Sequence, residues 1–84
     1  MARILYFAWL RERMGRTEEA LPLPPGIATV GELVALLRAR DDAGAQAFAH
    51  PATVRAAVNQ EFATPSTPVQ DADEVAFFPP VTGG

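Results

Sequence analysis

The stretch TVGELVALL, residues 29–37, carries the strongest local structural signal in this chain of 84 residues. Thr29 is followed three residues later by Glu32, which fits a capping box in which a hydroxyl and a carboxylate satisfy backbone N–H groups at a helix start. Apolar residues then recur at i, i+3, i+4 and i+7, namely at Val30, Leu33, Val34 and Leu37. This stripe predicts an amphipathic helix that packs on one face of a sheet.

A β-hairpin is expected before this helix. The segment RILYFAWL, residues 3–10, alternates two apolar sets and is rich in aromatic and β-branched residues, which predicts a strand covered on both faces. RERMGR, residues 11–16, turns the chain at Gly15, and EEALPL, residues 18–23, is a shorter second strand. Pro22 places that second strand at a sheet edge, because proline has no N–H to donate to a ladder.

Further strands are expected after the helix. The predicted order is a second short helix (DDAGAQAFAH, 41–50), a strand (ATVRAAV, 52–58), a turn at Asn59-Gln60 and a return strand (EFA, 61–63). A proline-rich loop (64–73) then leads to the last strand (EVAFF, 74–78). A hairpin, a crossing helix and a C-terminal strand make the β-grasp arrangement. We therefore predict an α+β fold with a mixed sheet of four to five strands packed on one main helix. The domain spans residues 1–78, and residues 79–84 form an extended, flexible tail that ends in Gly-Gly.

Composition excludes several classes of chemistry. The chain has no cysteine and one histidine, His50, so disulfides, thiolate nucleophiles and a metal cage are not expected. Net charge is −3 and all seven basic residues are arginine, so no basic face for nucleic acid is indicated. ILYFAWL, residues 4–10, is too short to cross a bilayer. We expect a cytoplasmic protein that binds neither membrane nor nucleic acid.

Paired carboxylates do not point to catalysis. They occur at Glu18-Glu19, Asp41-Asp42 and Asp73-Glu74. Neighbours along a strand project to opposite faces, so the members of such a pair do not converge on one substrate. We interpret them as solvated surface charges.

The last six residues, PPVTGG, are the most unusual part of the chain. Pro79 and Pro80 impose an extended start, and the four residues that follow reach roughly 13 Å. Gly83 and Gly84 lack a Cβ, so the tip fits a narrow channel, and the Gly84 carboxylate needs activation, most simply by AMP, before it reacts. The alternative is a frayed end with no role, since chain termini are often disordered.

The two phenylalanines before the tail are predicted to separate between the faces of the last strand. The pairing with Val75 puts Phe77 in the core, which leaves Phe78 on the other face at the root of the tail. An aromatic side chain there suits a protein interface, although a second small core under the sheet accounts for it equally well.

DEVAFFPPVTGG, residues 73–84, closely resembles the C-terminus of the small, sulfur-carrier subunit family of molybdopterin synthase. AVNQ at 57–60, and Tyr6-Phe7-Ala8, Arg11-Glu12 and Gly15 at the front, resemble the same family. The resemblance implies a ubiquitin-like β-grasp carrier that is not catalytic alone. It implies that an E1-like enzyme uses ATP to adenylate Gly84, which then becomes a thiocarboxylate. The carrier itself binds no cofactor.

The resemblance also implies partners and roles. A sulfurtransferase would supply the sulfur, and the tail would enter the large synthase subunit, in a heterotetramer, to give sulfur to cyclic pyranopterin monophosphate for the molybdopterin dithiolene. Pro79 and Pro80 would aim the tail, and Val81, Thr82 and Gly83 would lie in the channel. The residues expected to dock partners are Phe78, Phe7 and Arg11.

Alternatives stay open for the docking residues and for the function. Phe7 could instead pack in the core, and Arg11 could be a solvated charge in a turn. Trp9 widens the docking surface if it is exposed and belongs to the core if it is buried. The same tail chemistry would also serve a thiamine-type sulfur carrier or a ubiquitin-like modifier conjugated to lysines. An interaction module with an inert tail is a further alternative.

Overall fold

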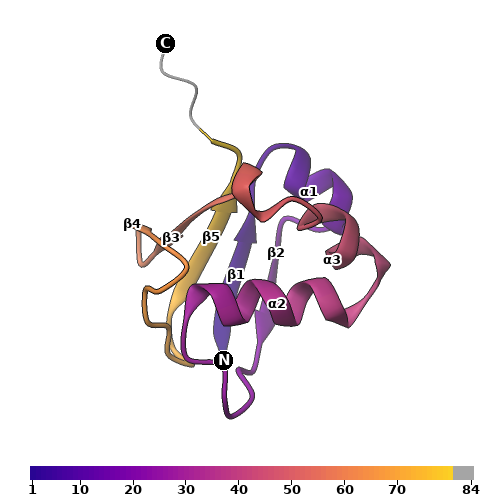
Figure 1. Cartoon of the computed structure of the whole chain (residues 1–84). Helices are drawn as coiled ribbons and strands as arrows, with labels where there is room; N and C mark the ends of the chain where they lie inside the picture. Colours follow the sequence, from indigo (N-terminus) through magenta and orange to yellow (C-terminus); the bar gives the residue numbers. More distant parts are fainter. Residues whose placement is uncertain (81–84) are drawn as a thin grey trace.

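Five strands form one mixed sheet, and the helices pack on one side of it in this computed structural model, which describes residues 1–80 (Figure 1). The predicted β-grasp architecture is confirmed. The elements are β1 (Ala2–Tyr6), α1 (Trp9–Met14), β2 (Glu18–Leu21), α2 (Val30–Arg40), α3 (Asp42–Ala47), the 3₁₀ turn η1 (Pro51–Thr53), β3 (Arg55–Val58), β4 (Glu61–Ala63) and β5 (Glu74–Phe78).

The sheet order is β2-β1-β5-β3-β4, so the first and last strands in the chain are neighbours in the middle of the sheet. β1 and β5 run parallel, with Ile4 opposite Val75 and Tyr6 opposite Phe77. The other three strand pairs are antiparallel. β2 lies at the edge, as expected of a strand followed directly by a proline.

Helix α2 begins with the predicted cap. The Thr29 hydroxyl accepts a hydrogen bond from the backbone N–H of Glu32 at 3.2 Å. The Glu32 carboxylate in turn accepts from the backbone N–H of Ala28 at 3.0 Å, one residue earlier than in the usual capping box. Two N–H groups at the helix start are thereby satisfied, which fixes where α2 begins.

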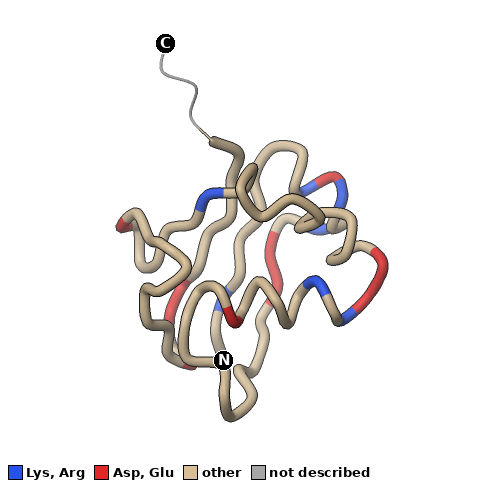
Figure 2. Tube along the Cα trace, viewed as in Figure 1, with Lys and Arg blue, Asp and Glu red and all other residues tan. Residues whose placement is uncertain are grey.

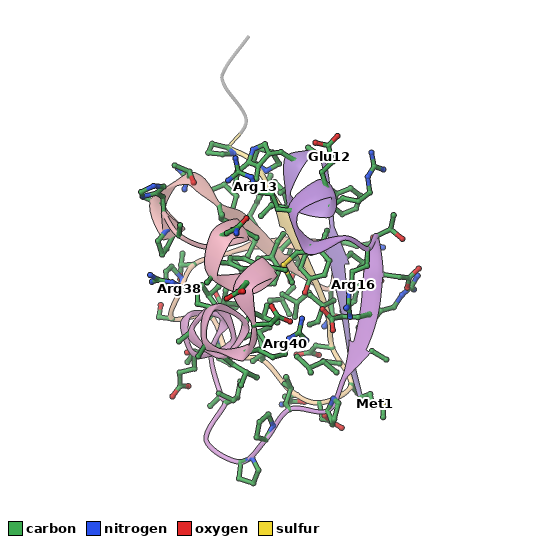
Figure 3. The ribbon with its side chains drawn as sticks, turned by 90° about the vertical axis from the view of Figure 1, so that its right-hand side faces the viewer. Met1, Glu12, Arg13, Arg16, Arg38 and Arg40 are labelled. Carbon is green, nitrogen blue, oxygen red and sulfur yellow. The ribbon has the colours of Figure 1, made fainter. Side chains whose placement is uncertain are left out.

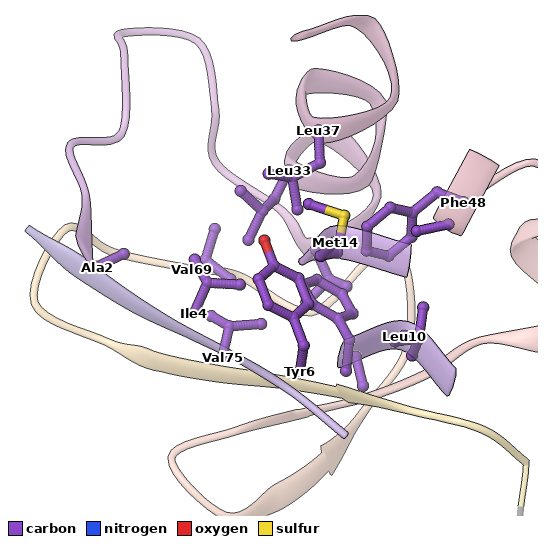
Figure 4. Close-up of a cluster of buried hydrophobic side chains, with 14 residues drawn as sticks. Ala2, Ile4, Tyr6, Leu10, Met14, Leu33, Leu37, Phe48, Val69 and Val75 are labelled. Carbon is purple, nitrogen blue, oxygen red and sulfur yellow. The ribbon is translucent and has the colours of Figure 1, made fainter. Parts of the chain in front are cut away.

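The core lies between the helices and the covered face of the sheet (Figure 4). The apolar stripe predicted for α2 supplies Val30, Leu33 and Leu37, all of which are buried, and Val34 is half-buried. The largest fully buried side chains are Tyr6, Phe48, Phe77, Ile4, Leu10, Leu33, Leu37 and Val75. At the far end of the sheet, Asn59 and Gln60 both have positive φ and make the predicted hairpin turn between β3 and β4.

The first predicted strand is wrong in two respects. It is covered on one face only, since Arg3 is exposed and Leu5 lies on the side of the sheet away from the helices. The strand predicted over residues 3–10 ends at Tyr6, and the segment predicted as a turn is helix α1. Ala8 has φ 55°, which breaks the extended backbone. Leu10 and Met14 then lie one helical turn apart and are both buried, and Gly15 ends the helix in the left-handed conformation. A short amphipathic helix therefore covers one end of the core.

The surface carries charges of both signs. Acidic and basic residues are scattered over the described chain rather than collected on one face (Figure 2). Within residues 1–80, no helix is long and apolar enough to cross a membrane.

Candidate docking face and tail root

The tail leaves the sheet from the end of β5. Pro79 and Pro80 follow Phe78 directly, belong to no strand and are half-buried (Figure 1). The strand thus ends before the prolines, which supply no N–H to continue its ladder. The remaining tail positions, Val81, Thr82, Gly83 and Gly84, lie outside the described residues, and the roles predicted for them stay predictions.

Phe77 and Phe78 occupy opposite faces of β5, as predicted. Phe77 is fully buried, with its ring edge-to-face against Phe48 at 5.1 Å and stacked with Tyr6 at 6.4 Å between ring centroids. Phe78 is half-buried and lies 6.0 Å from the ring of Phe62. Phe77 therefore belongs to the core, whereas Phe78 is available on the side of the sheet away from the helices.

Phe78 lies at one end of a group of apolar residues on that side, with Arg55 as its partner across the neighbouring strand. We call this apolar group the open face. Strand register places Leu5 beside Ala76, Ala76 beside Ala57, and Ala57 beside Phe62. Phe62 is 83% exposed, the largest value among the large apolar residues of the described chain. Contiguous exposed apolar surface of this kind is typical of a protein–protein contact. The open face consists of Leu5, Ala57, Phe62, Ala76 and Phe78.

Phe7 extends this surface toward the tail. Its backbone N–H donates to the carbonyl of Phe77 at 3.0 Å, so it remains hydrogen-bonded to β5 just before the tail root. Its side chain is 50% exposed. The alternative that Phe7 packs in the core is therefore wrong, and its docking role stays a prediction.

Arg11 and Trp9 lie on α1 rather than on a strand or turn. Arg11 is exposed, and the described residues give it no ion pair or side-chain hydrogen bond. Trp9 is half-buried, packs against the core with part of its surface, and holds the Arg13 guanidinium 4.7 Å from its ring centroid. This cation–π contact places the Arg13 guanidinium over one face of the Trp9 ring. The docking role predicted for Arg11 stays a prediction.

Glu19 is the one clear exception to the interpretation of the carboxylate pairs as solvated charges. Its side chain is 10% exposed and joins three elements of the fold. It accepts hydrogen bonds from the Tyr6 hydroxyl at 2.7 Å and from Arg40 at 2.7 and 3.0 Å, and Arg16 lies 3.1 Å away. Figure 3 shows Arg16 and Arg40 on the side where β2 meets the helices.

The environment of Glu19 changes its acidity. Burial raises the pKa of the carboxyl, but the hydrogen bonds from Arg40 and Tyr6 and the nearby guanidinium charges outweigh burial and hold it below its ordinary value. Burial, followed by the bond to Glu19, raises the pKa of Tyr6. At neutral pH, Glu19 is therefore ionised, Tyr6 keeps its proton and Arg40 is charged. We interpret this cluster as a contact that stabilises the fold rather than as an acid–base pair.

The described residues bring Phe78, Phe7 and Phe62 to the side of the sheet away from the helices, and a docking role for them stays a prediction. Within residues 1–80, no group of three or more histidine, cysteine, aspartate or glutamate side chains could hold a metal ion. The sequence predicted an outward position for Phe78 and named Phe7 as a docking candidate, but it did not single out Phe62 or Leu5. The signal for Phe62 was an aromatic residue in a very short strand after a tight turn, next to a charged neighbour, Glu61.

Comparisons with known proteins agree with one another over the whole chain. The ThiS family matches residues 4–84. The chain is 43% identical over 86 residues to the molybdopterin synthase sulfur carrier subunit of Escherichia coli (strain K12), and the alignment covers all of both chains. It is 36% identical over 84 residues to the subunit of the same name from Haemophilus influenzae, again with full coverage of both.

Solved structures with the same fold are also similar in sequence. One is described as a putative molybdopterin converting factor, subunit 1, from Pyrococcus furiosus, with TM-score 0.77 and 30% identity over 95% of this chain and 97% of that chain. Another is SAMP1, a small archaeal modifier protein from Haloferax volcanii, with TM-score 0.72 and 26% identity over 99% of this chain and 98% of that chain. The chain therefore belongs to the ThiS family, has the ubiquitin-like β-grasp fold, and is related over its full length to the molybdopterin synthase sulfur carrier subunits.

Proposed function

We propose that this chain is the sulfur-carrier small subunit of molybdopterin synthase. The observation that carries the proposal is the full-length similarity, at 43% identity, to a protein of that name. The sequence also supports the proposal through Gly83-Gly84, which follow the two prolines and provide the Gly84 carboxylate that would carry the sulfur. The absence of cysteine is compatible with a carrier that holds sulfur on its own carboxyl terminus.

The first step is activation of Gly84. Its carboxylate attacks the α-phosphorus of ATP in the active site of an E1-like enzyme, pyrophosphate leaves, and an acyl-adenylate remains. A sulfur nucleophile at the oxidation level of sulfide then attacks the acyl carbon and expels AMP, which leaves a thiocarboxylate. A sulfurtransferase is the sulfur source. If it delivers a persulfide, a thiol must reduce the resulting acyl disulfide and is itself oxidised.

The second step takes place in the large subunit of the synthase. The thiocarboxylate sulfur attacks a side-chain carbon of cyclic pyranopterin monophosphate and displaces an oxygen substituent from that carbon, which leaves as water or as the oxygen of the opened cyclic phosphate. Water then cleaves the acyl–sulfur bond, which leaves the sulfur on the pterin and restores the Gly84 carboxylate. Two such transfers give the dithiolene. The chain is therefore a sulfur donor in a sulfurtransferase complex, and the complex is expected to be a heterotetramer with one small subunit at each end of a large-subunit dimer.

The open face and the tail root would hold the carrier on its partners. Phe78 and Phe7 lie at the end of β5, where the tail begins, so a partner seated on them also receives the tail. Partly exposed aromatic side chains are the residues that most often dominate binding energy at interfaces. Exposed Arg11, on the neighbouring helix α1, would add a charge contact at the rim.

Mass spectrometry tests the proposal directly. The protein is incubated with a cognate E1-like enzyme, ATP and a sulfur source, and the intact mass is measured. Replacement of one oxygen by one sulfur is expected, localised to Gly84 by fragmentation of the C-terminal peptide. Fragmentation is needed because oxidation of Met1 or Met14 adds nearly the same mass.

A chain that lacks Gly84 is the control and should remain unmodified. The loaded carrier is then mixed with the large subunit and cyclic pyranopterin monophosphate, and loss of sulfur from the tail is followed together with molybdopterin formation. An unmodified tail, in the presence of an activating enzyme proven active on another carrier, would contradict the proposal. It would favour the interaction module with an inert tail.

The similarity to SAMP1 supports a second candidate, a protein modifier conjugated through Gly84 to lysines of other proteins. Activation is shared by the two functions, and they differ in the acceptor. In the modifier, the amine of a target lysine attacks the activated carbonyl and displaces the AMP or sulfur group. Glycine-glycine remnants on lysines of many cellular proteins, dependent on Gly84, would identify this function.

A further inference from the structure

Arg55 is the cross-strand neighbour of Phe78 at the root of the tail. Opposite residues of an antiparallel pair project to the same face of the sheet, and the next residue of β3, Ala56, is buried on the helix side. The side chain of Arg55 therefore lies beside Phe78, on the side of the open face. The register of β3 with β4 ends at Ala56 and Ala63, so Arg55 has no partner on β4.

No carboxylate of the described chain forms an ion pair with Arg55, although Arg3, Arg16 and Arg40 each have one. Arg55 is exposed, and its Nη1 donates to the backbone carbonyl of Ala52 in η1 at 3.0 Å. This bond uses one of the five N–H donors of a guanidinium and fixes where the group lies. Arg55 is thus a positioned cation that the described residues leave without a counter-ion.

A partner that receives the tail has to cover the surface around Phe78, and Arg55 lies within that surface. Covering a guanidinium removes it from water, which is costly unless an anionic acceptor replaces the lost hydration. An apolar partner surface would suit Phe78 but would leave this cost uncompensated. A carboxylate opposite Arg55 would instead form charge-assisted hydrogen bonds with a group that is already held in place.

We propose that Arg55 determines which large subunit the carrier accepts, by pairing with a carboxylate beside the entrance that receives the tail. This inference rests on the proposed function, because it requires the large subunit to contact Phe78 and the tail root. A subunit stays bound to its partner, whereas an activating enzyme releases the carrier. The large subunit is therefore the partner that has to satisfy Arg55 at equilibrium.

The proposed contact provides specificity as well as attraction. A large subunit with a basic or an apolar group opposite Arg55 would leave a covered, unpaired charge and would bind more weakly. The net charge of the chain is −3, so long-range forces do not draw it to an acidic surface. The pairing therefore has to be a local contact, and Phe78 supplies apolar area beside it.

Calorimetric titration of the full chain with its cognate large subunit, at about 0.15 M salt, tests the contact. Arg55→Glu should weaken binding by about tenfold or more, because it places two carboxylates against each other. Arg55→Leu keeps the apolar bulk but loses the charge, and should weaken binding about threefold to tenfold. Arg55→Lys keeps the charge without the planar fork and should lie between Arg55→Leu and the unmodified chain.

Arg38→Glu is the matched control, since it changes the net charge by the same amount on the other side of the sheet. Arg38 is exposed on α2 and also has no ion pair among the described residues, and Figure 3 shows it at the outer edge of the molecule. This variant should change the affinity by less than about twofold. The defect of Arg55→Glu should shrink at about 0.5 M salt, and circular dichroism establishes that each variant folds.

Reciprocal charge exchange identifies the matching group on the partner. Each aspartate and glutamate of the large subunit is changed to lysine, one at a time, and titrated with Arg55→Glu. One of these lysines should return the affinity to within about threefold of the unmodified pair, and should itself weaken binding of the unmodified chain. A fold defect in Arg55→Glu would not be repaired in this way.

The outcomes separate this inference from the proposed function. When the unmodified chain binds the large subunit and carries sulfur on Gly84, three results overturn the inference alone. These are unchanged affinity of Arg55→Glu, an equal loss in Arg38→Glu, and the absence of a restoring lysine. Normal binding of Arg55→Glu with slower sulfur loading would also overturn it, because the contact would then belong to the activating enzyme.

Failure of the unmodified chain both to bind and to be loaded would overturn the proposed function, and this inference with it. If Arg55→Glu does not fold, Arg55→Leu and Arg55→Lys decide the outcome. Equal affinities of these two variants would then overturn the role of the charge.

Discussion

The two faces of the sheet are built from the same strands but differ in what covers them. On the helix side, the side chains of Ile4, Tyr6, Val75 and Phe77 are buried under three helices. On the open face, the alternating partners of these residues have no helix above them, and Phe62 extends into solvent. Neighbouring phenylalanines at positions 77 and 78 therefore occupy opposite environments. Alternate residues of one strand thus lie in the core and on the open face, and recognition is the role that we propose for the open-face set.

The sharpest test of this division is the replacement of each phenylalanine in turn. Phe77→Ala removes a fully buried ring that contacts Phe48 and Tyr6, and should lower the free energy of unfolding by about 3–5 kcal/mol. Phe78→Ala should lower it by about 1 kcal/mol or less, since its ring is half-buried and packs mainly on Phe62. Urea denaturation measures both values. Equal losses of stability would mean that Phe78 belongs to a second small core on the open face.

Replacement of Glu19 should have the next largest effect on stability, because its carboxylate joins the edge strand β2 to Arg40 at the end of α2. Glu19→Gln keeps the shape but removes the charge that Arg40 and Arg16 face, and should cost about 1.5–3 kcal/mol of stability. Glu18→Gln, on the exposed side of the same strand, is the matched control and should lower stability much less, because water screens the pair that Glu18 makes with Arg3. Thermal or chemical denaturation that ranks the two variants equally would count against the buried role of Glu19.

The stability that Glu19 contributes should depend on pH. The pKa of Glu19 in the folded chain is below its ordinary value of 4.5, so its carboxylate stabilises the fold fully above that value. This contribution is lost as the pH falls through the lower pKa of the folded state. The stability difference between the unmodified chain and Glu19→Gln should therefore be largest at neutral pH and shrink in acid. A difference that stays constant into acid would contradict the assignment.

For partner binding we expect the opposite ranking, with the larger effect from the open face. Phe78→Ala should weaken association with the large subunit of molybdopterin synthase by about 1–3 kcal/mol, although it barely changes stability. Calorimetric titration measures the affinity, with Phe62→Ala as a second open-face variant. Unchanged affinity in both variants would move the docking surface elsewhere, and α1 with Arg11 would be the next region to test.

The smallest effect is expected at the start of α2. Thr29→Ala removes the hydroxyl that accepts from the Glu32 N–H, and should cost about 1 kcal/mol of stability with no change in partner affinity. Thr29→Ser retains the acceptor and should restore most of the loss. If serine does not restore it, the threonine acts through packing rather than through the cap.

The regular parts of the fold could be predicted because local and periodic signals agreed there. The cap at Thr29, the apolar stripe of α2 and the alternation in β5 all indicate the elements that the structure contains. Helix α1 was missed because Leu10 and Met14 follow an alternating apolar run that ends only at a change of backbone conformation. The spacing of Leu10 and Met14, followed by Gly15, was the signal for a short helix.

The Glu19 cluster and part of the open face depended on contacts between distant segments. The burial of Glu19 required Arg40, which lies on another element and is 21 residues away along the chain. No local pattern predicts such a pair, because an acidic residue in an edge strand is usually solvated. Phe78 was identified correctly because β5 alternates, whereas Phe62 joined it only through the register of β3 with β4 and β5.

The parallel pairing of β1 with β5 has a consequence for the order in which the protein matures. The centre of the sheet needs both the first strand synthesised and the last, so it remains incomplete until residues 74–78 have left the ribosome. Contacts between segments so distant in sequence slow folding, because the entropy of closing the long loop is lost before the contacts form. Because Phe78, which precedes the two prolines, belongs to the strand that completes the sheet, an unfinished or misfolded chain does not hold Pro79 and Pro80 in the position that the structure shows. Completion of the sheet is therefore a condition for the correct placement of these prolines.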